Sequence, residues 1–255
     1  MNSELGVVAD LPLTRRELLW RGAVSAAGVT VLGALAGCGA SAGTASPSAA
    51  SIPSLTPPTT ADEALKRLMD GNARFVADAT ITLGEDKARR LDTAEHQSPF
   101  AIVVGCSDSR VPPELLFDQG IGDIFTVRVA GNTAAAPAVM GSIEYAAEHL
   151  GSLIVVVLGH ESCGAVKATI DHVLNGASEH GSIPSLVEPI VPAVQAVKDQ
   201  AADKIVDAAV QQNAKLQAQA IATSAAILQP LVAAGRLKVI PAEYHLATGQ
   251  VAVLG

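Results

Sequence analysis

Two uninterrupted apolar runs constrain the fold more than any other feature of this sequence. Ala101 to Val104 and Leu153 to Leu158 consist of aliphatic residues, mostly β-branched, and Ile124 to Val129 is a third strand-like segment. Strands that are buried on both faces of a parallel sheet have this continuous pattern. Pro113 and Pro137 each open a helical segment between the strands. The sequence therefore predicts an α/β fold with a mostly parallel central sheet and flanking helices.

The domain that contains these strands is predicted to span residues 59–255. Thr60 begins a capping box, and the apolar stripe that follows predicts a helix over residues 61–77. At the other end, Leu237 to Leu246 and Val251 to Leu254 are separated by turn residues. This pattern predicts a C-terminal hairpin.

The residues ahead of the domain have the pattern of an export signal and a tether. Thr14 to Leu19 resembles a twin-arginine motif, and Leu35 to Cys38 resembles a lipobox. We therefore expect residues 1–37 to be a twin-arginine lipoprotein signal, removed before Cys38, which is then lipidated. The alternative is an uncleaved N-terminal anchor helix. Residues 38–58 are rich in Ser, Ala, Pro and Thr and predict a flexible linker. Both alternatives predict an extracytoplasmic domain anchored to the cell membrane.

The charge pattern argues against a nucleic-acid partner. The formal net charge is −8, and no basic block or basic-aromatic pattern is present. Proteins that bind nucleic acids usually carry a clustered basic surface. We therefore do not expect nucleic acid to be a partner of this chain.

Soft metal ligands follow the two most apolar strands. Cys106 comes after the first strand, and His160 and Cys163 come after the second, so each group is expected just beyond a strand end. Ligands bind beyond the carboxyl ends of the strands in open α/β sheets, so these side chains are expected to meet. Two thiolates and an imidazole suit Zn²⁺, and three protein ligands leave one position open, as in catalytic sites.

Asp108 and Arg110 are expected to decide what occupies that open position. They lie two residues apart in an extended turn and are predicted to form an ion pair. A carboxylate held by arginine is drawn away from the metal, which leaves the fourth position to water. Zinc lowers the pKa of a bound water and so yields hydroxide near neutral pH.

These motifs resemble a known family. Cys106-Ser-Asp108-Ser-Arg110 together with His160-x-x-Cys163 closely resembles the β-class carbonic anhydrases, and the likeness covers nearly all of residues 60 to 255. The resemblance implies a zinc lyase in which zinc-bound hydroxide converts CO2 reversibly to bicarbonate and a proton. It also implies a homodimer or a higher homo-oligomer. The implied roles are Cys106, His160 and Cys163 as metal ligands; Asp108 and Arg110 as the catalytic dyad, with Asp108 as fourth ligand in a closed state; and Gln97, Phe125, Tyr145 and Gly164 as pocket residues.

Three alternatives remain open from the sequence. A Cys106–Cys163 disulfide would suit an exported protein but would leave His160, Asp108 and Arg110 without a role. A member of the same family that hydrolyses CS2 or COS would use the same zinc ligands. A lipoprotein with a closed, structural zinc would act as a binding module, with Asp108 as a permanent ligand.

Overall fold

The computed structural model describes residues 56–81, 84–224 and 226–255. The predicted signal, Cys38 and the linker up to residue 55 therefore lie outside the described residues, and their assignments stay predictions. The described residues all belong to one compact unit, Ser51–Gly255. No helix in this part of the chain is long and apolar enough to cross a membrane.

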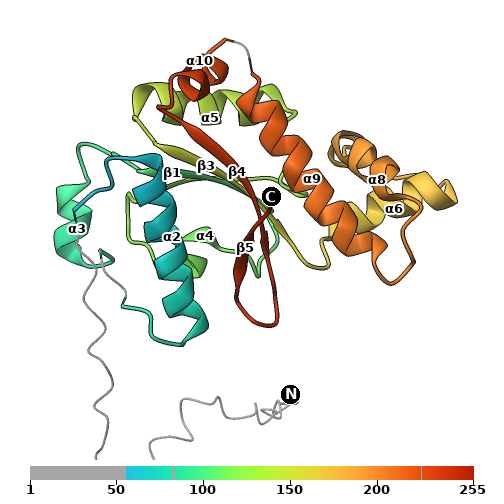
Figure 1. The fold of residues 1–255 in the computed structure, drawn as a ribbon, viewed down its shortest axis with the longest axis horizontal. Helices are drawn as coiled ribbons and strands as arrows, with labels where there is room; N and C mark the ends of the chain where they lie inside the picture. The colour runs from blue at the N-terminus through green and yellow to red at the C-terminus, as the bar shows by residue number, and fades with distance from the viewer. Residues whose placement is uncertain (1–55, 82–83, 225) are drawn as a thin grey trace, which may run out of the picture. The chain divides into compact units, whose positions relative to one another are not determined.

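A five-stranded sheet with the order β2-β1-β3-β4-β5 forms the centre of the domain (Figure 1). The first four strands in this order are parallel to their neighbours, and β5 pairs antiparallel with β4. The predicted α/β fold with a mostly parallel sheet and a C-terminal hairpin is thus confirmed. The strands are β1 Ala101–Gly105, β2 Ile124–Arg128, β3 Ile154–His160, β4 Lys238–Tyr244 and β5 Val251–Val253.

Strand β3 differs from the prediction at its end. We expected it to stop at Leu158, with His160 beyond the strand, but it continues through Gly159 to His160, which pairs with Tyr244 of β4. Gly159 does not end the strand. A Cβ atom at this position would lie 3.0 Å from Val210 Cγ1, so the glycine allows a helix to approach the strand closely.

The helices follow the predicted segments, with one addition. The capping box at Thr60 is present, and the helix that it begins covers Ala61–Val76. The short helix Lys87–Asp92 was not predicted, because none of its residues is buried and its sequence has no apolar stripe. The helices are α2 Ala61–Val76, α3 Lys87–Asp92, α4 Pro113–Leu116, α5 Pro137–His149, α6 Gly164–Asn175, α7 Pro184–Val187, η1 Glu188–Ile190, α8 Val191–Val197, α9 Ile205–Ala222 and α10 Leu228–Ala233.

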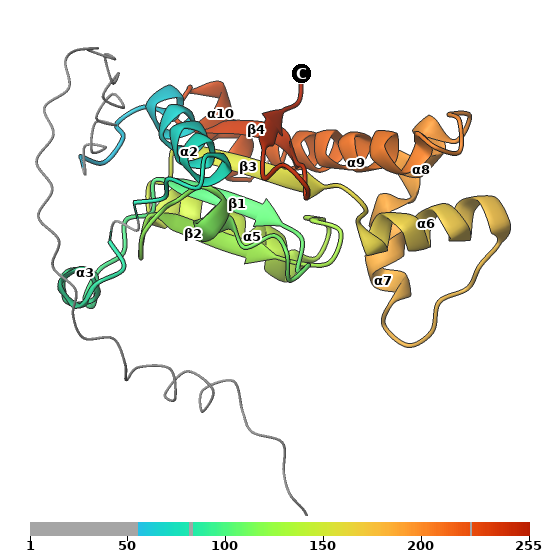
Figure 2. The ribbon, with the colours of Figure 1, turned by 90° about the horizontal axis from the view of Figure 1, so that it is seen from below.

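Apolar clusters cover both faces of the sheet. One cluster joins α2 to one face, and a second joins α5, α9 and α10 to the other. A third cluster, which includes Cys106 and Cys163, packs residues of α6, α8 and α9 together. Figure 2 shows that β1 and β3 point toward the end of the domain where α6, α7 and α8 gather. The carboxyl ends of β1 and β3 therefore face the end of the domain that carries these helices.

One buried side chain of helix α2 is hydrogen bonded to two other parts of the domain. Asn72 Nδ2 donates to the carbonyl oxygens of Leu116 and Gly249, at 3.0 and 2.8 Å. Its Oδ1 accepts from the Val251 N–H at 2.8 Å. The preceding Gly71 lies so close to α4 that a Cβ atom would fall 1.8 Å from the carbonyl oxygen of Phe117. This part of α2 therefore holds the β4–β5 hairpin and α4 in one arrangement.

Candidate metal centre

Three potential metal ligands meet at the carboxyl ends of β1 and β3. Cys106 directly follows β1, His160 ends β3, and Cys163 is the N-cap residue of α6. One ligand atom from each lies within 4.8 Å of the other two. All three residues are buried, with exposed fractions of 5% for Cys106, 0% for His160 and 1% for Cys163. The structure thus brings together the three residues that the sequence predicted as ligands.

The imidazole of His160 is oriented for metal binding. Its Nδ1 lies 2.9 Å from the carbonyl oxygen of Glu161. A carbonyl oxygen can only accept, so Nδ1 carries the proton and Nε2 presents its lone pair. Nε2 is fully buried and makes no hydrogen bond within the described structure. A buried nitrogen without a partner is costly, and a metal ion would satisfy it.

The two cysteine sulfurs are coupled to each other by a hydrogen bond. A hydrogen bond from the Cys163 thiol, aided by the one from the Gly131 N–H, lowers the pKa of Cys106 to about 4 despite its burial. The same hydrogen bond, in which Cys163 is the donor, together with burial raises the pKa of Cys163 well above its ordinary range. Both cysteines are free thiols, so the structure does not contain the alternative disulfide. The sulfur atoms of Cys106 and Cys163 and the lone pair of His160 Nε2 fit the ligand preferences of zinc.

Asp108 is held away from the three ligands by Arg110. Its Oδ1 accepts from the backbone N–H and the Nε of Arg110, both at 2.9 Å, and its Oδ2 accepts from Nη2 at 2.7 Å. The hydrogen bonds from the Arg110 side chain keep the pKa of Asp108 far below its usual range. Asp108 Oδ2 lies 3.9 Å from His160 Nε2, too far for a hydrogen bond. An ionised carboxylate thus lies beside the ligand set but is bound to a guanidinium.

The backbone that carries Cys106 and Asp108 is fixed by residues that sequence reasoning missed. Arg128, the last residue of β2, donates from Nε to the carbonyl oxygen of Cys106 at 2.8 Å and from Nη2 to that of Asp108. The Gly131 N–H donates to Cys106 Sγ at 3.4 Å. The contact follows from the strand register of the structure, in which Arg128 pairs with Gly105, the residue before Cys106.

Comparison with known proteins connects this geometry to a family. The family model described as carbonic anhydrase matches residues 101–251. The chain belongs to the carbonic anhydrase family. A carbonic anhydrase from Mycolicibacterium smegmatis is 43% identical over 188 residues, which cover 74% of this chain and 90% of that protein. The chain is a carbonic anhydrase of the β class, a zinc-dependent lyase, and Cys106, His160 and Cys163 form a group that could hold the ion.

Solved β-carbonic anhydrases have the same fold. The Coccomyxa enzyme in complex with acetazolamide is 26% identical, with a TM-score of 0.58, over 74% of this chain and 86% of that chain. A protein described among two tetrameric β-carbonic anhydrases from Sordaria macrospora is 20% identical, with a TM-score of 0.59, over 76% of this chain and 98% of that chain. The second likeness supports the fold alone.

The residues predicted to line a carbonic anhydrase pocket are not gathered around the metal ligands within one chain. Phe125 pairs with Ile102 in the sheet, several residues before the carboxyl end of β1. It lies against Tyr145 of α5, with ring centroids 6.4 Å apart, and Tyr145 is 48% exposed. Gln97 is exposed in the segment before β1. Only Gly164 adjoins the ligands: it follows Cys163, and nothing lies within 4 Å of where its Cβ would be. The pocket roles of these four residues stay predictions.

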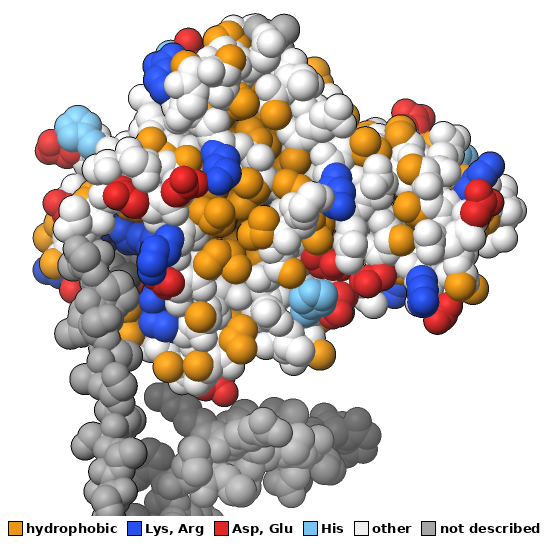
Figure 3. Space-filling view, viewed as in Figure 1, with side chains coloured by type: hydrophobic (Ala, Val, Ile, Leu, Met, Phe, Trp, Pro, Cys, Tyr) orange, Lys and Arg blue, Asp and Glu red, His pale blue; other side chains and the backbone are white. Residues whose placement is uncertain are grey.

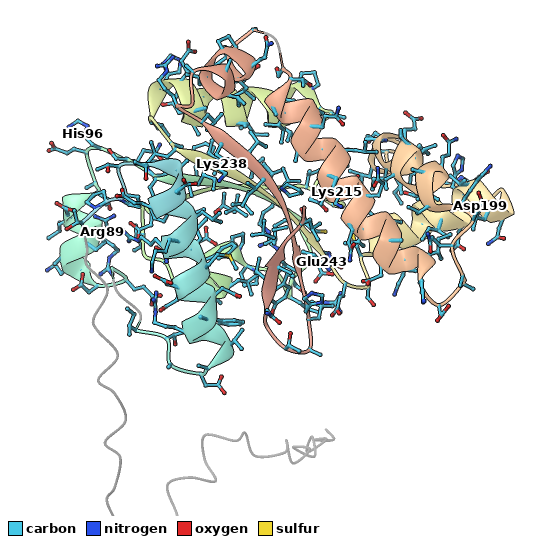
Figure 4. All side chains as sticks on the ribbon, viewed as in Figure 1. Arg89, His96, Asp199, Lys215, Lys238 and Glu243 are labelled. Carbon is cyan, nitrogen blue, oxygen red and sulfur yellow. The ribbon has the colours of Figure 1, made fainter. Side chains whose placement is uncertain are left out.

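A second polar cluster in this carbonic anhydrase domain lies next to His160 and was also missed. Glu161 Oε1 lies 2.9 Å from His245 Nδ1, and Glu161 Oε2 accepts from the Leu246 N–H at 2.8 Å. Glu243 of β4 (labelled in Figure 4) is 1% exposed, and burial raises its pKa to about 7. Its Oε2 accepts from Gln211 at 2.9 Å. These contacts join the β4–β5 hairpin and α9 to the strand that bears His160.

Proposed function

We propose that this chain is a zinc-dependent carbonic anhydrase that converts CO2 and water reversibly to bicarbonate and a proton. The observation that carries the proposal is the convergence of Cys106, His160 and Cys163 within 4.8 Å beside a carboxylate held by arginine. Zinc in such a site supplies a Lewis acid that lowers the pKa of water. The family membership gives the same activity.

Asp108 is proposed to orient the reacting water. Because Arg110 keeps it ionised, Asp108 acts only as a hydrogen-bond acceptor at neutral pH. Its Oδ2 is bonded to Arg110 Nη2 but keeps acceptor capacity, at 3.9 Å from His160 Nε2. A hydrogen bond from the water to Oδ2 would direct a lone pair of that water toward CO2. Arg128 supports this role by holding the carbonyl oxygen of Asp108.

The position of Asp108 favours an enzyme over a closed structural zinc site. A structural site needs a fourth protein ligand. In this structure both oxygens of Asp108 are hydrogen bonded to Arg110, which draws the carboxylate to the side of the ligand set. The arrangement supports a fourth position that remains open to water, as in catalytic zinc sites.

Stopped-flow CO2 hydration of Asp108→Asn tests the proposal. We expect kcat/KM to fall by about 100-fold or more, since an acceptor that orients a reacting water is replaced by an amide, while zinc content stays unchanged. Asp92→Asn is the matched control, because Asp92 forms an exposed pair with Arg89 at 3.1 Å on α3. Wild-type protein that is loaded with zinc but inert toward CO2 at alkaline pH would contradict the proposal, and CS2 and COS would then be the substrates to test.

The proposed active form is a homo-oligomer, at least a dimer. Phe125 and Tyr145 lie together and away from the metal ligands of their own chain, so a pocket role for them requires a neighbouring subunit. The Sordaria macrospora relatives of the same fold are tetrameric. Figure 3 shows apolar side chains gathered at the surface between α2 and α9, which is typical of an interaction face. Sedimentation analysis of the exported domain is the direct test, and a monomer with full activity would contradict this part.

Export and anchoring through Cys38 are proposed from the sequence motifs alone. The twin-arginine-like residues Arg15 and Arg16 and the lipobox-like segment before Cys38 support the proposal. In cells, Cys38→Ser is expected to move the protein from the membrane fraction to the soluble extracytoplasmic fraction. Arg15→Lys with Arg16→Lys is expected to leave it inside. Membrane attachment that survives Cys38→Ser would instead favour an uncleaved anchor helix.

A further inference from the structure

Two buried amide side chains of α9 belong to a series of hydrogen bonds that ends at Cys106. Asn213 and Gln217 lie four residues apart, so they share one face of the helix. Their exposed fractions are 1% and 7%. Burial of two amides is costly unless their polar atoms are paired, so their partners indicate what this face of α9 is for.

Those partners belong to the loop that follows β2. Asn213 Nδ2 donates to the carbonyl oxygen of Gly131 at 2.8 Å. Gln217 Oε1 accepts from the Ala134 N–H at 2.9 Å. Gln217 Nε2 lies 3.4 Å from Asn213 Oδ1 and donates to the carbonyl oxygen of Pro189 at 3.3 Å. The two amides therefore form a short ladder that holds residues 131–134 at both ends.

Gly131 of this loop connects Asn213 to Cys106. Gly131 is bound by Asn213 through its carbonyl oxygen and donates its N–H to Cys106 Sγ at 3.4 Å. Its φ angle is +78°, and a Cβ atom would lie 2.5 Å from Ile190 Cδ1, so no other residue fits at this position without a shift. A donor aimed at sulfur stabilises the thiolate form that binds metal.

We propose that Asn213 and Gln217 are positioning residues for the zinc ligand Cys106, acting through the loop of residues 131–134. Hydrogen bonds beyond the ligands orient the ligands and set their donor strength, and losing one typically costs 10- to 100-fold in metal affinity or activity. The inference rests on the zinc site of the proposed function and adds residues that no ligand motif contains.

Asn213→Leu tests the proposal, because it keeps the branched shape and the number of heavy atoms of the side chain but removes its donor and its acceptor. Zinc affinity is measured by competition with a chelator, and the cobalt-substituted protein reports the sulfur environment through its thiolate charge-transfer band. We expect zinc affinity to fall by about 10-fold or more and the band to shift. Gln217→Met removes the other end of the ladder and is expected to produce a smaller change in the same direction, which keeps the test available if Asn213→Leu does not fold.

Ile221→Ala is the matched control for general destabilisation of α9. Ile221 is fully buried one turn beyond Gln217 and packs in the apolar cluster of α5, α9 and α10. Its side chain has no polar atom, so its replacement leaves the hydrogen bonds of Asn213 and Gln217 to the loop in place. It is expected to lower the stability to unfolding while leaving zinc affinity and the cobalt band as in wild type. Wild-type affinity and an unshifted band in both Asn213→Leu and Gln217→Met would overturn the positioning role. Wild-type protein that fails to bind zinc would overturn the zinc function as well.

Discussion

Replacement of Asn72 by alanine should be one of the most destabilising changes in this domain that spares the metal site. The side chain is 2% exposed and makes three hydrogen bonds to backbone groups of Leu116, Gly249 and Val251. At roughly 1 to 1.5 kcal/mol for each bond, with a further penalty for leaving buried groups unpaired, the loss is about 3 to 5 kcal/mol. This is a large part of the stability of an ordinary domain, about 5 to 15 kcal/mol.

The measurement is the free energy of unfolding in urea, taken on zinc-loaded protein at one pH. Asn175→Ala is the matched control, because Asn175 makes one exposed hydrogen bond, to Asp171 at 3.2 Å. Its effect should stay within about 0.5 kcal/mol. Asn72→Asp keeps the acceptor for Val251 but loses both donors, so it should fall below wild type as well. A loss of less than about 1 kcal/mol for Asn72→Ala, with an unchanged m-value, would refute the view that this amide joins α2 to the hairpin.

Three further predictions follow from single contacts. Gly71→Ala should lower the free energy of unfolding by about 3 kcal/mol or more, because its Cβ would lie 1.8 Å from the Phe117 carbonyl oxygen. The measurement is Tm, which should fall. Gly141→Ala is the control and should be tolerated, because nothing lies within 4 Å of a Cβ at that position. Burial raises the pKa of Glu243 from 4.5 to about 7, so its contribution to stability is complete below pH 4.5 and is lost as the pH rises through 7. Glu243→Gln should remove this pH-dependent loss of stability, which amounts to roughly 3 kcal/mol. If the unfolding free energy of the variant depends on pH as in wild type, the prediction is wrong. Cys163→Ser should weaken zinc binding at least about tenfold, since a thiolate ligand is lost; unchanged metal content after dialysis against a chelator would exclude Cys163 as a ligand.

The parts of the fold that the sequence predicted are those with local signals. Continuous aliphatic runs gave β1 and β3, and the capping box at Thr60 gave the start of α2. The ligands could be predicted because soft side chains lie at the ends of two neighbouring strands or just beyond them. The end of β3 was predicted two residues too early, because the aliphatic run stops at Leu158 while the strand continues through Gly159, where Val210 of a distant helix approaches closely.

The residues that support the site could not be predicted in the same way. Arg128, Asn213 and Gln217 act through hydrogen bonds to backbone groups of segments far away in the sequence, and neither their residue type nor their spacing marks them. The pocket roles of Phe125 and Tyr145 remain predictions for a related reason. They depend on surroundings that one chain does not supply.

The order of the strands also decides when this metal centre can exist during folding. Ala101 pairs with Ile154, and Ile154 pairs with Lys238, so the centre of the sheet is built from contacts between distant parts of the chain. Such topologies fold slowly, because loops must close before the contacts form. Cys106 and His160 come together only after β1 and β3 have paired. Metal uptake would therefore show that β1 and β3 have paired. A bound ion would then stabilise the paired strands against unfolding.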